Sequence, residues 1–396
     1  MAIRRELRTV LILTACQALA QTGMVMIITA GGLAGHMLAA DKALATLPIS
    51  FAMIGTMITT IPASLFMGRY GRRPGFWVGT LFGALSGLLA VTSLLNGWFW
   101  AFCAAHTLYG VYQSFAQFYR FAAGEAAGPA FRSRAISYVL LGPAVAAVVG
   151  PHLAAFTRDF SAGGAFVATY GAIVVLSLVA TAVVTLVDVP KPVIEKSDAA
   201  ARPVSAIVRQ PTFLIAVIVA AVGYGVMNLA MTATPLAMQA HHHGMSDTAF
   251  VIQWHVLGMF LPSFFTGSLI ARFGAPQIML AGIALLLGHV AIALSGVEFL
   301  HFVSALILLG VGWNFTFLGG TNLLTETYRP SERAWAQGIN DFAVFATVVV
   351  ASFTSGVLLH LFGWNGVNLL ALPLLLGAGA ALIAFMLWRR RQPVTA

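Results

Sequence analysis

Residues 64–74 read Ser64-Leu-Phe-Met-Gly-Arg-Tyr-Gly-Arg-Arg-Pro74. This short basic stretch lies at the junction of two apolar runs, at 46–67 and 75–95. Each run is about 20 residues long, the length of α-helix that crosses roughly 30 Å of hydrocarbon. A bilayer offers the backbone no hydrogen-bond partners, so a spanning segment is either a helix or part of a closed barrel. The runs are continuous rather than short and alternating, and they therefore predict helices.

The rest of the chain repeats this pattern. Of the 396 residues, 59% are hydrophobic and 8% are charged, whereas a soluble domain carries about a quarter charged residues. The apolar windows predict an all-α membrane protein with twelve transmembrane helices, at 9–33, 46–67, 75–95, 99–123, 134–156, 163–187, 212–238, 248–270, 277–295, 300–324, 336–359 and 365–388. The one long polar stretch, at 188–211, predicts a linker between two six-helix bundles, at 1–187 and 212–396.

The basic residues are distributed unevenly across the predicted membrane. All 21 Lys and Arg residues except Lys42, Arg120 and Arg158 fall on the side that holds both termini and the linker. The positive-inside rule makes that side cytoplasmic and predicts a multi-pass protein of the plasma (bacterial inner) membrane. These cations face anionic lipid headgroups, so the net charge of +9 requires no nucleic-acid partner.

Two further features concern the apolar runs themselves. Cys16 and Cys103 both lie inside such runs, where a cysteine is expected to act as a small core residue. The first run lacks a small-residue cleavage site, so we expect it to be retained as the first span.

The junction at 64–74 has a counterpart in the second half of the chain. Residues 267–276 read Gly267-Ser-Leu-Ile-Ala-Arg-Phe-Gly-Ala-Pro276, so both junctions contain Arg-aromatic-Gly followed by Pro. A parallel repeat of six spans with this turn resembles the major facilitator superfamily, whose motif there is Gly-x-Leu-x-Asp-Arg-x-Gly-Arg-Arg. The resemblance covers essentially the whole chain. It implies a secondary transporter that uses alternating access, takes a small-molecule substrate and needs no cofactor, and we expect a monomer.

The chain departs from the motif at its acidic position, which is Gly68 here, and at its leading glycine, which is Ser64. In the family the acid helps to latch the cytoplasmic helix ends. The motif's basic residues are therefore expected to use other acids. The predicted gating residues are Arg69, Gly71, Arg72 and Arg73 of the motif, with Glu125 and Asp341 as acidic partners. In the alternative reading, the arginines only anchor the topology.

Polar side chains form stripes on four predicted spans. Spans one, four, seven and ten line a central cavity in the family, and these four spans carry the richest stripes. Polar groups that faced lipid would be costly, so the stripes should face each other or water. The predicted substrate-binding residues are Gln17, Gln21, His106, Tyr109, Gln113, Gln117, Arg120, Tyr224, Asn228, Trp313, Asn314 and Asn322. In the alternative, the same side chains form hydrogen bonds between helices.

Arg120 is the one basic residue predicted inside a span. An arginine deep in a bilayer costs roughly 2.5–3.5 kcal/mol on insertion scales. Its function would be to attract an anionic group of the substrate. Alternatively, it snorkels to the membrane surface or pairs with Glu125 on the same helix. His106 either contacts substrate or carries a proton, or else it is a hydrogen-bonded histidine inside the bundle.

The coupling ion is less well marked, because no carboxylate falls near the middle of a span. If protons drive transport, the candidates are Glu125, Asp341 or a histidine among His106, His152, His255 and His289. Passive facilitation stays open. Adjacent histidines at His241–His243 lack the separation of a typical metal site, and we predict no functional metal there.

The sequence thus favours a carrier of a small organic, anionic or polar metabolite. The alternative is a proton-coupled drug or metabolite exporter, suggested by Gly142-Pro143 and Gly150-Pro151 in span five. A non-transporting sensor or an intramembrane enzyme is a weaker alternative. No phosphate-binding Gly-x-x-x-x-Gly-Lys loop is present for an ATP-driven pump, and no His-Glu-x-x-His pair is present for a metalloprotease.

Overall fold

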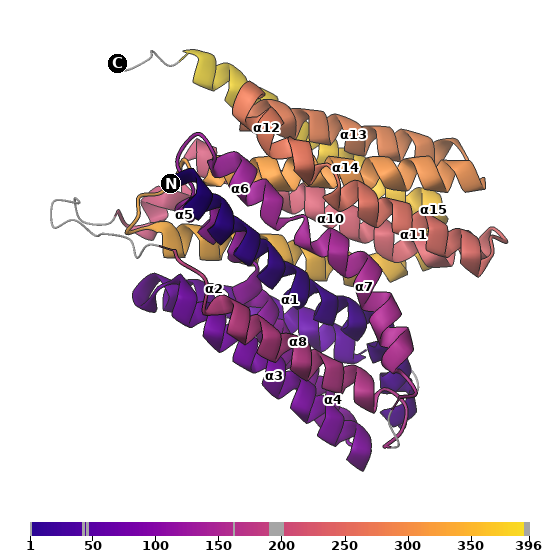
Figure 1. Cartoon of the computed structure of the whole chain (residues 1–396). Helices are drawn as coiled ribbons and strands as arrows, with labels where there is room; N and C mark the ends of the chain where they lie inside the picture. The colour runs from indigo at the N-terminus through magenta and orange to yellow at the C-terminus, as the bar shows by residue number, and fades with distance from the viewer. Residues whose placement is uncertain (1, 42–43, 45–46, 161–162, 190–201, 392–396) are drawn as a thin grey trace. The chain divides into compact units, whose positions relative to one another are not determined.

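The structure is a computed structural model that describes residues 2–41, 44, 47–160, 163–189 and 202–391 (Figure 1). All regular secondary structure in these ranges is helical. Lys42 and the linker residues 190–201, which include Lys191 and Lys196, lie outside the described residues. The chain divides into two compact units. Unit 1 comprises Met1–Ile194 together with Gln337–Phe342, and unit 2 comprises Glu195–Ala336 and Ala343–Ala396.

Unit 1 is a helical bundle in which α1 and α4 pack against several neighbours. Its helices are α1 (Ala2–Leu38), α2 (Leu47–Tyr70), α3 (Arg72–Asn96), α4 (Phe99–Ala116), α5 (Tyr119–Ala126), α6 (Arg132–Val139), α7 (Gly142–Thr157) and α8 (Val167–Val184). α4 packs on α2 and α3, while α1 packs on α7 and α8. Figure 1 shows α3 running beside both α4 and α8.

Unit 2 is organised around α14 (Phe299–Leu324), which packs on α10 (Pro211–Ala240), α11 (Met245–Phe260) and α13 (Ala275–Ser295). Its other helices are α9 (Val204–Val208), α12 (Ser263–Phe273) and most of α15 (Arg333–Arg391). Six residues near the start of α15, Gln337–Phe342, group with unit 1 instead.

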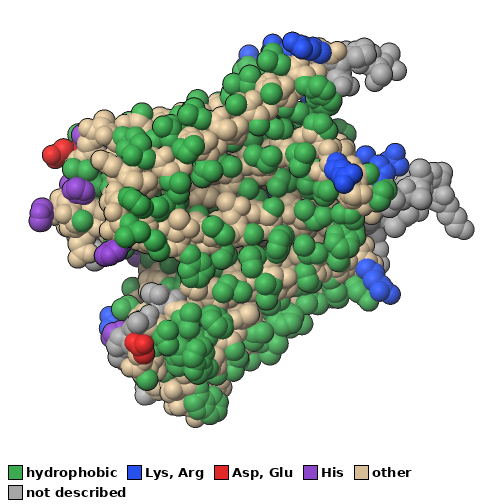
Figure 2. Space-filling model, turned by 180° about the vertical axis from the view of Figure 1, so that it is seen from behind, with side chains coloured by type: hydrophobic (Ala, Val, Ile, Leu, Met, Phe, Trp, Pro, Cys, Tyr) green, Lys and Arg blue, Asp and Glu red, His purple; other side chains and the backbone are tan. Residues whose placement is uncertain are grey.

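Ten helical segments within the described ranges are long and apolar enough to span a membrane. One of them, α15, contains a non-helical glycine, Gly363, with φ 65° and ψ −170°, between the predicted spans 336–359 and 365–388. The predicted span 99–123 corresponds to α4 and α5, which are separated at Gln117–Phe118. The twelve-helix prediction is therefore confirmed, and hydrophobic side chains cover much of the face of the molecule shown in Figure 2.

Two predicted spans are interrupted at proline. Span five is divided into α6 and α7, and Pro143 lies in the first turn of α7. Span eight is divided into α11 and α12, and Pro262 immediately precedes α12. Proline has no backbone N–H, so the helical hydrogen bond is lost where it stands. The two interruptions therefore coincide with prolines, whereas Pro62 of α2 and Pro235 of α10 lie inside uninterrupted helices.

The two related motifs form the same turn. Gly71 has φ 99° and ψ 166° between α2 and α3, and Gly274 has φ 90° and ψ 152° between α12 and α13. Each glycine N–H donates to the carbonyl four residues earlier, to Met67 at 2.9 Å and to Ile270 at 2.8 Å. A residue with a Cβ is strained in this region of backbone space, so the glycine of the motif is the residue that permits the turn.

Close helix packing is also repeated in the two units. A Cβ added to Gly110 of α4 would lie 2.2 Å from the Ala52 carbonyl oxygen of α2. A Cβ added to Gly310 of α14 would lie 2.5 Å from the His255 carbonyl oxygen of α11. Both contacts are with backbone, so the helices approach closely only because the side chain is a hydrogen atom.

An ion pair between half-buried Arg202 and buried Glu332 fixes the chain just before α9 to the turn between α14 and α15. The Arg202 guanidinium donates to both Glu332 carboxylate oxygens, at 2.8 and 2.6 Å. The Glu332 side chain is fully buried, and it also accepts a hydrogen bond from the Arg329 backbone N–H at 3.0 Å. These bonds to Arg202 hold the pKa of Glu332 at about 2, below its ordinary 4.5. The pair also raises the pKa of Arg202.

This pair makes the stability of unit 2 dependent on pH. A carboxylate with a depressed pKa stabilises the fold above its unfolded pKa, and the contribution is lost as pH falls from about 4.5 to about 2. We expect Glu332→Gln to lower the free energy of unfolding at pH 7 by about 2–3 kcal/mol. The difference from wild type should shrink between pH 4.5 and pH 3 in thermal melts of detergent-purified protein. Glu326→Gln, which breaks the exposed pair with Arg389, is the matched control. A pH-independent difference for Glu332→Gln would contradict this account.

Candidate functional site

The structure contains a buried charged cluster in unit 1, built from α3, α5 and the six residues of α15 that group with this unit. Arg72 of α3 donates to the two Glu125 oxygens at 3.0 and 2.5 Å. It also donates to the Gln337 amide oxygen at 2.5 Å. The Arg72 side chain is 3% exposed. Arg72 thus uses a different acid in place of the one missing at Gly68, as the sequence predicts.

The second ion pair of the cluster joins Arg120 of α5 to Asp341 of α15. Arg120 donates to Asp341 Oδ1 at 2.5 Å, and the two side chains are 3% and 0% exposed. Arg120 also donates to the Gln117 backbone and side-chain oxygens at 3.0 and 3.1 Å. The Asn340 amide donates to the same Asp341 oxygen at 2.7 Å. Arg120 therefore pairs with Asp341. The sequence alone suggests a substrate anion, the membrane surface or Glu125 as the partner of this arginine.

Two motif arginines lie outside this network. The guanidinium of Arg69 lies over the Tyr70 ring at 5.5 Å, and that of Arg73 lies over the Trp77 ring at 5.0 Å. Such cation–π contacts contribute about 0.5–1 kcal/mol at exposed sites. Gln337 and Asn340 had not been singled out in the sequence, because a helix-end amide carries no pattern that marks it as a partner of arginine.

The polar stripe of α4 lies against α1 within unit 1. Tyr109 donates from its hydroxyl to the Ala20 carbonyl oxygen at 2.7 Å, and the Gln113 amide donates to the same oxygen at 3.0 Å. A Cβ at Gly23 would lie 2.0 Å from the Tyr109 hydroxyl, so this glycine makes room for the ring. Tyr109 and Gln113 therefore bind α4 to α1, and these contacts match the alternative in which polar side chains form hydrogen bonds between helices.

Two buried amide oxygens of this region, Gln17 Oε1 and Gln113 Oε1, have no hydrogen-bond partner among the described residues. Such atoms are costly to bury unpaired, at about 1–3 kcal/mol each. They can accept hydrogen bonds from a polar solute. The nearby hydroxyls of Tyr112 and Tyr119 interact with each other. Tyr112 and Tyr119 lie off the predicted stripe, so helical spacing alone did not identify them.

His106 is fully paired. Its Nδ1 lies 2.8 Å from the Phe102 carbonyl oxygen, and that oxygen is an acceptor only, so Nδ1 carries the hydrogen. The Tyr170 hydroxyl then donates to Nε2 at 3.1 Å. His106 is 1% exposed. Of the readings open from the sequence, the geometry matches a hydrogen-bonded histidine inside the bundle.

In unit 2, Trp313 of α14 lies at the centre of an aromatic cluster. Its ring stacks on Phe317, with centroids 5.1 Å apart and planes at 13°. Tyr224 of α10 and Phe260 of α11 approach it edge-on, at 5.2 and 5.6 Å. Phe345 of α15 lies 6.0 Å from Tyr224. The Trp313 indole N–H is buried and has no acceptor among the described residues. This cluster presents flat aromatic surface and one free donor.

Two of the three asparagines predicted for the site form hydrogen bonds that join helices. Asn314 donates to the Met259 carbonyl oxygen and the Ser263 hydroxyl, both at 2.7 Å. It also accepts from Thr266 at 2.7 Å, so it joins α14 to α11 and α12. Asn228 donates to Ser352 at 2.7 Å and joins α10 to α15. These contacts match the alternative in which polar side chains bind helix to helix.

The remaining predicted positions show fewer contacts. Asn322 donates to the Leu318 carbonyl oxygen of its own helix at 2.8 Å. Gln21 is half-buried on α1. His243, from the triplet considered for metal binding, has its Nε2 2.8 Å from the Val297 carbonyl oxygen, so this nitrogen donates and is not free to ligate a cation. Cys16 and Cys103 are both buried with free thiols.

Comparison with known proteins matches the chain to the family model described as Major Facilitator Superfamily, over residues 10–254 and 224–396. The chain is 43% identical to the riboflavin transporter RfnT of Brucella anthropi over 371 residues, which cover 93% of each protein. It is 27% identical to the uncharacterized MFS-type transporter YddS of Bacillus subtilis over 373 residues, 88% of this chain and 84% of that protein.

Solved structures show the same fold. The human organic anion transporter MFSD10 superposes with a TM-score of 0.77 at 12% identity, covering 95% of this chain and 99% of that one. A bacterial homologue of the iron transporter ferroportin, in an outward-facing state, gives 0.74 at 13% identity, with coverage of 96% and 99%. At such identities the likeness concerns the fold alone.

Proposed function

Because this chain belongs to the Major Facilitator Superfamily, and is thus a multi-pass membrane transporter and not an enzyme, we propose that it carries riboflavin or a closely related flavin. The observation that carries this proposal is the 43% identity to a riboflavin transporter over 93% of both chains.

The chemistry of each unit, taken by itself, supports a flavin. The isoalloxazine ring is flat, aromatic and uncharged at neutral pH, and its imide edge has one N–H donor between two carbonyl acceptors. The aromatic cluster around Trp313 offers a stacking surface and an indole N–H for a flavin carbonyl. The amide oxygens of Gln17 and Gln113 offer acceptors for a flavin N–H or ribityl hydroxyls.

The charged cluster provides information on the charge of the substrate. The hypothesis of an anionic substrate relies on the charge of Arg120, and in this structure Asp341 neutralises that charge at 2.5 Å. In this cluster Arg72 is paired with Glu125 and Arg120 with Asp341, and such neutralised cations favour an uncharged, polar substrate. Among the substrates considered from the sequence, a polar metabolite therefore agrees better with the geometry than an organic anion does.

We assign the charged cluster the function of a gate in the transport cycle. Arg72 and Arg120 hold the first turns of α15 while the gate is closed, and these pairs separate when it opens. Asp341 also retains an oxygen, Oδ2, for which the described residues provide no hydrogen-bond partner, so it is the carboxylate we assign to a coupling proton. The proposal further places both termini in the cytoplasm of a bacterial cell and treats the monomer as the transporting unit.

Flavin binding is tested directly with purified protein. Riboflavin should raise the melting temperature in detergent, because a ligand that binds only the folded state stabilises it. Flavin mononucleotide, which adds a phosphate, and a panel of organic anions should stabilise the protein less. Proteoliposomes should accumulate labelled riboflavin. Stabilisation by organic anions with no response to riboflavin would overturn the proposal.

The role of Trp313 has its own test. Trp313→Phe keeps an aromatic ring but removes the indole N–H, and loss of one neutral hydrogen bond costs about 0.5–1.5 kcal/mol. We expect the dissociation constant for riboflavin to rise about 2- to 10-fold, measured by flavin fluorescence quenching. Trp98→Phe, at an indole that is 56% exposed, is the matched control and should leave binding unchanged. Equal affinities for the two variants would remove Trp313 from the site.

A further inference from the structure

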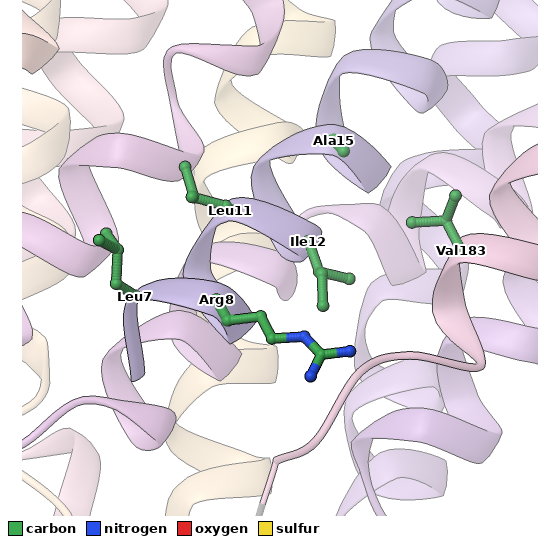
Figure 3. A pocket seen from close by; sticks show the side chains of 6 residues that line it. All are labelled: Leu7, Arg8, Leu11, Ile12, Ala15 and Val183. Atoms are coloured by element: carbon green, nitrogen blue, oxygen red, sulfur yellow. The ribbon is translucent and has the colours of Figure 1, made fainter. Parts of the chain in front are cut away.

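A groove of about 400 Å³ lies on the surface of unit 1, between the first turns of α1 and the last turn of α8. It is lined by Leu7, Arg8, Leu11, Ile12, Ala15 and Val183 (Figure 3). Arg8 and Ile12 project from α1 toward the side where Val183 stands. Both helices belong to unit 1 and pack on each other, so the groove is a property of this unit alone.

The walls of the groove are apolar and exposed, as expected of a surface that faces lipid. Leu11 is 56% exposed on α1, and Leu186, just beyond α8, is 54% exposed. Exposed apolar side chains continue along α8 at Val175, Leu178 and Val179. Water is not available to fill an apolar groove beside the hydrocarbon of the bilayer. The molecule that can fill it there is a lipid acyl chain.

Arg8 gives this apolar groove a charged end. The membrane-spanning part of α1 covers 33 residues, Glu6–Leu38. At 1.5 Å per residue it is about 50 Å long, well beyond a hydrocarbon core of about 30 Å, so Arg8 stands near the headgroup level. Arg8 is exposed and makes no ion pair within the described part of the chain. A guanidinium in this position matches the paired oxygens of a phosphate.

We propose that the groove binds one anionic phospholipid, with its phosphate on Arg8 and an acyl chain along Leu11, Ile12 and Ala15. Ala15 lies about 10 Å from Arg8 along the helix axis, so the groove accommodates the upper part of the chain. The basic residues near both termini mark this side of the membrane as the one that attracts anionic lipid. The site is separate from the aromatic cluster of unit 2 and does not depend on the proposed substrate.

The test uses the full chain in detergent and phosphatidylglycerol as the probe. Native mass spectrometry should show one lipid retained by the wild type, with phosphatidylcholine retained less. Arg8→Gln should raise the apparent dissociation constant for phosphatidylglycerol about 5- to 10-fold. Arg390→Gln is the control, because Arg390 is another exposed arginine close to a chain end and lies outside the groove.

A second variant separates the headgroup from the acyl chain. Ala15→Phe fills the groove and keeps Arg8, and Ala15 is exposed, so the fold should be retained. Loss of phosphatidylglycerol retention in this variant supports acyl-chain binding. Retention equal to wild type in Arg8→Gln, equal retention of phosphatidylcholine, or equal thermal stabilisation by inorganic phosphate would each overturn the proposal.

Discussion

Asp341→Asn should lower the free energy of unfolding by about 3–5 kcal/mol, because it leaves the guanidinium of Arg120 buried without its counter-charge. Both side chains of the pair are nearly inaccessible to water, so solvent cannot screen the unpaired charge. We expect a fall of several degrees in the melting temperature in detergent. Because the pair belongs to the proposed gate, riboflavin uptake by proteoliposomes should also fall at least tenfold.

Two further variants test whether the loss of stability comes from the unpaired buried charge or from the substitution of the side chain. The double variant Arg120→Gln/Asp341→Asn removes both charges, and it should be more stable than either single variant because no buried charge is left unpaired. Asp159→Asn, which breaks an exposed pair with Arg158 at 3.6 Å, should change stability by less than about 1 kcal/mol.

The transport assay then decides the role of the pair. If the double variant regains stability but not uptake, the ion pair functions in the cycle. If it regains both, Arg120 and Asp341 stabilise unit 1 and the gate assignment is wrong. If Asp341→Asn is as stable as Asp159→Asn, the buried pair itself is not as we describe it.

Gly110→Ala should be the most disruptive single-methyl change on α4. The added methyl would meet the Ala52 carbonyl oxygen at 2.2 Å and the Thr56 nitrogen at 2.8 Å. Both atoms are backbone, so α2 and α4 must separate to admit it. Overpacking of this kind costs about 1–3 kcal/mol, and a rigid backbone neighbour puts the value at the upper end. Thermal melts and expression level measure the effect.

The equivalent change in unit 2 should behave alike. Gly310→Ala would place a methyl 2.5 Å from the His255 carbonyl oxygen and 2.8 Å from the Met259 nitrogen. The matched controls are Gly171→Ala in unit 1 and Gly377→Ala in unit 2, because a Cβ at either position meets nothing within 4 Å. Alanine also favours helix over glycine by roughly 0.5–1 kcal/mol, so the controls should be neutral or slightly stabilising. Equal stability of Gly110→Ala and Gly171→Ala would contradict the close approach of α2 and α4.

Much of the fold could be predicted from the sequence, because span length and the repeated turn are local properties. The apolar runs predicted the positions of the helices, and the Arg-aromatic-Gly motif predicted equivalent turns at Gly71 and Gly274. Proline positions inside two runs accounted for interruptions that hydropathy averages out. The break at Gly363 fell between two predicted spans. Local signals were sufficient here because lipid leaves the backbone few alternatives to the helix.

The site was less predictable, because the choice of partner depends on tertiary packing. The sequence offers Glu125 and Asp341 as available acidic partners, and the structure pairs the first with Arg72 and the second with Arg120. Helical spacing placed Asn314 in the same stripe as Trp313. The amide of Asn314, however, is fully used between helices. One sequence does not show which face of a polar helix meets a neighbour, and that face decides between a ligand contact and a helix contact.

The backbone at Gly71 and Gly274 also limits what mutation can do at these codons. Every missense change from a glycine codon, whichever base is altered, introduces a residue with a Cβ. At φ 99° and φ 90° with extended ψ, all those products are strained, whatever the chemistry of the new side chain. The two turns are therefore positions where a conservative substitution does not exist. Sequence drift in this transporter can change exposed flanking residues such as Arg69 and Tyr70 far more freely than the achiral residue at the centre of the turn.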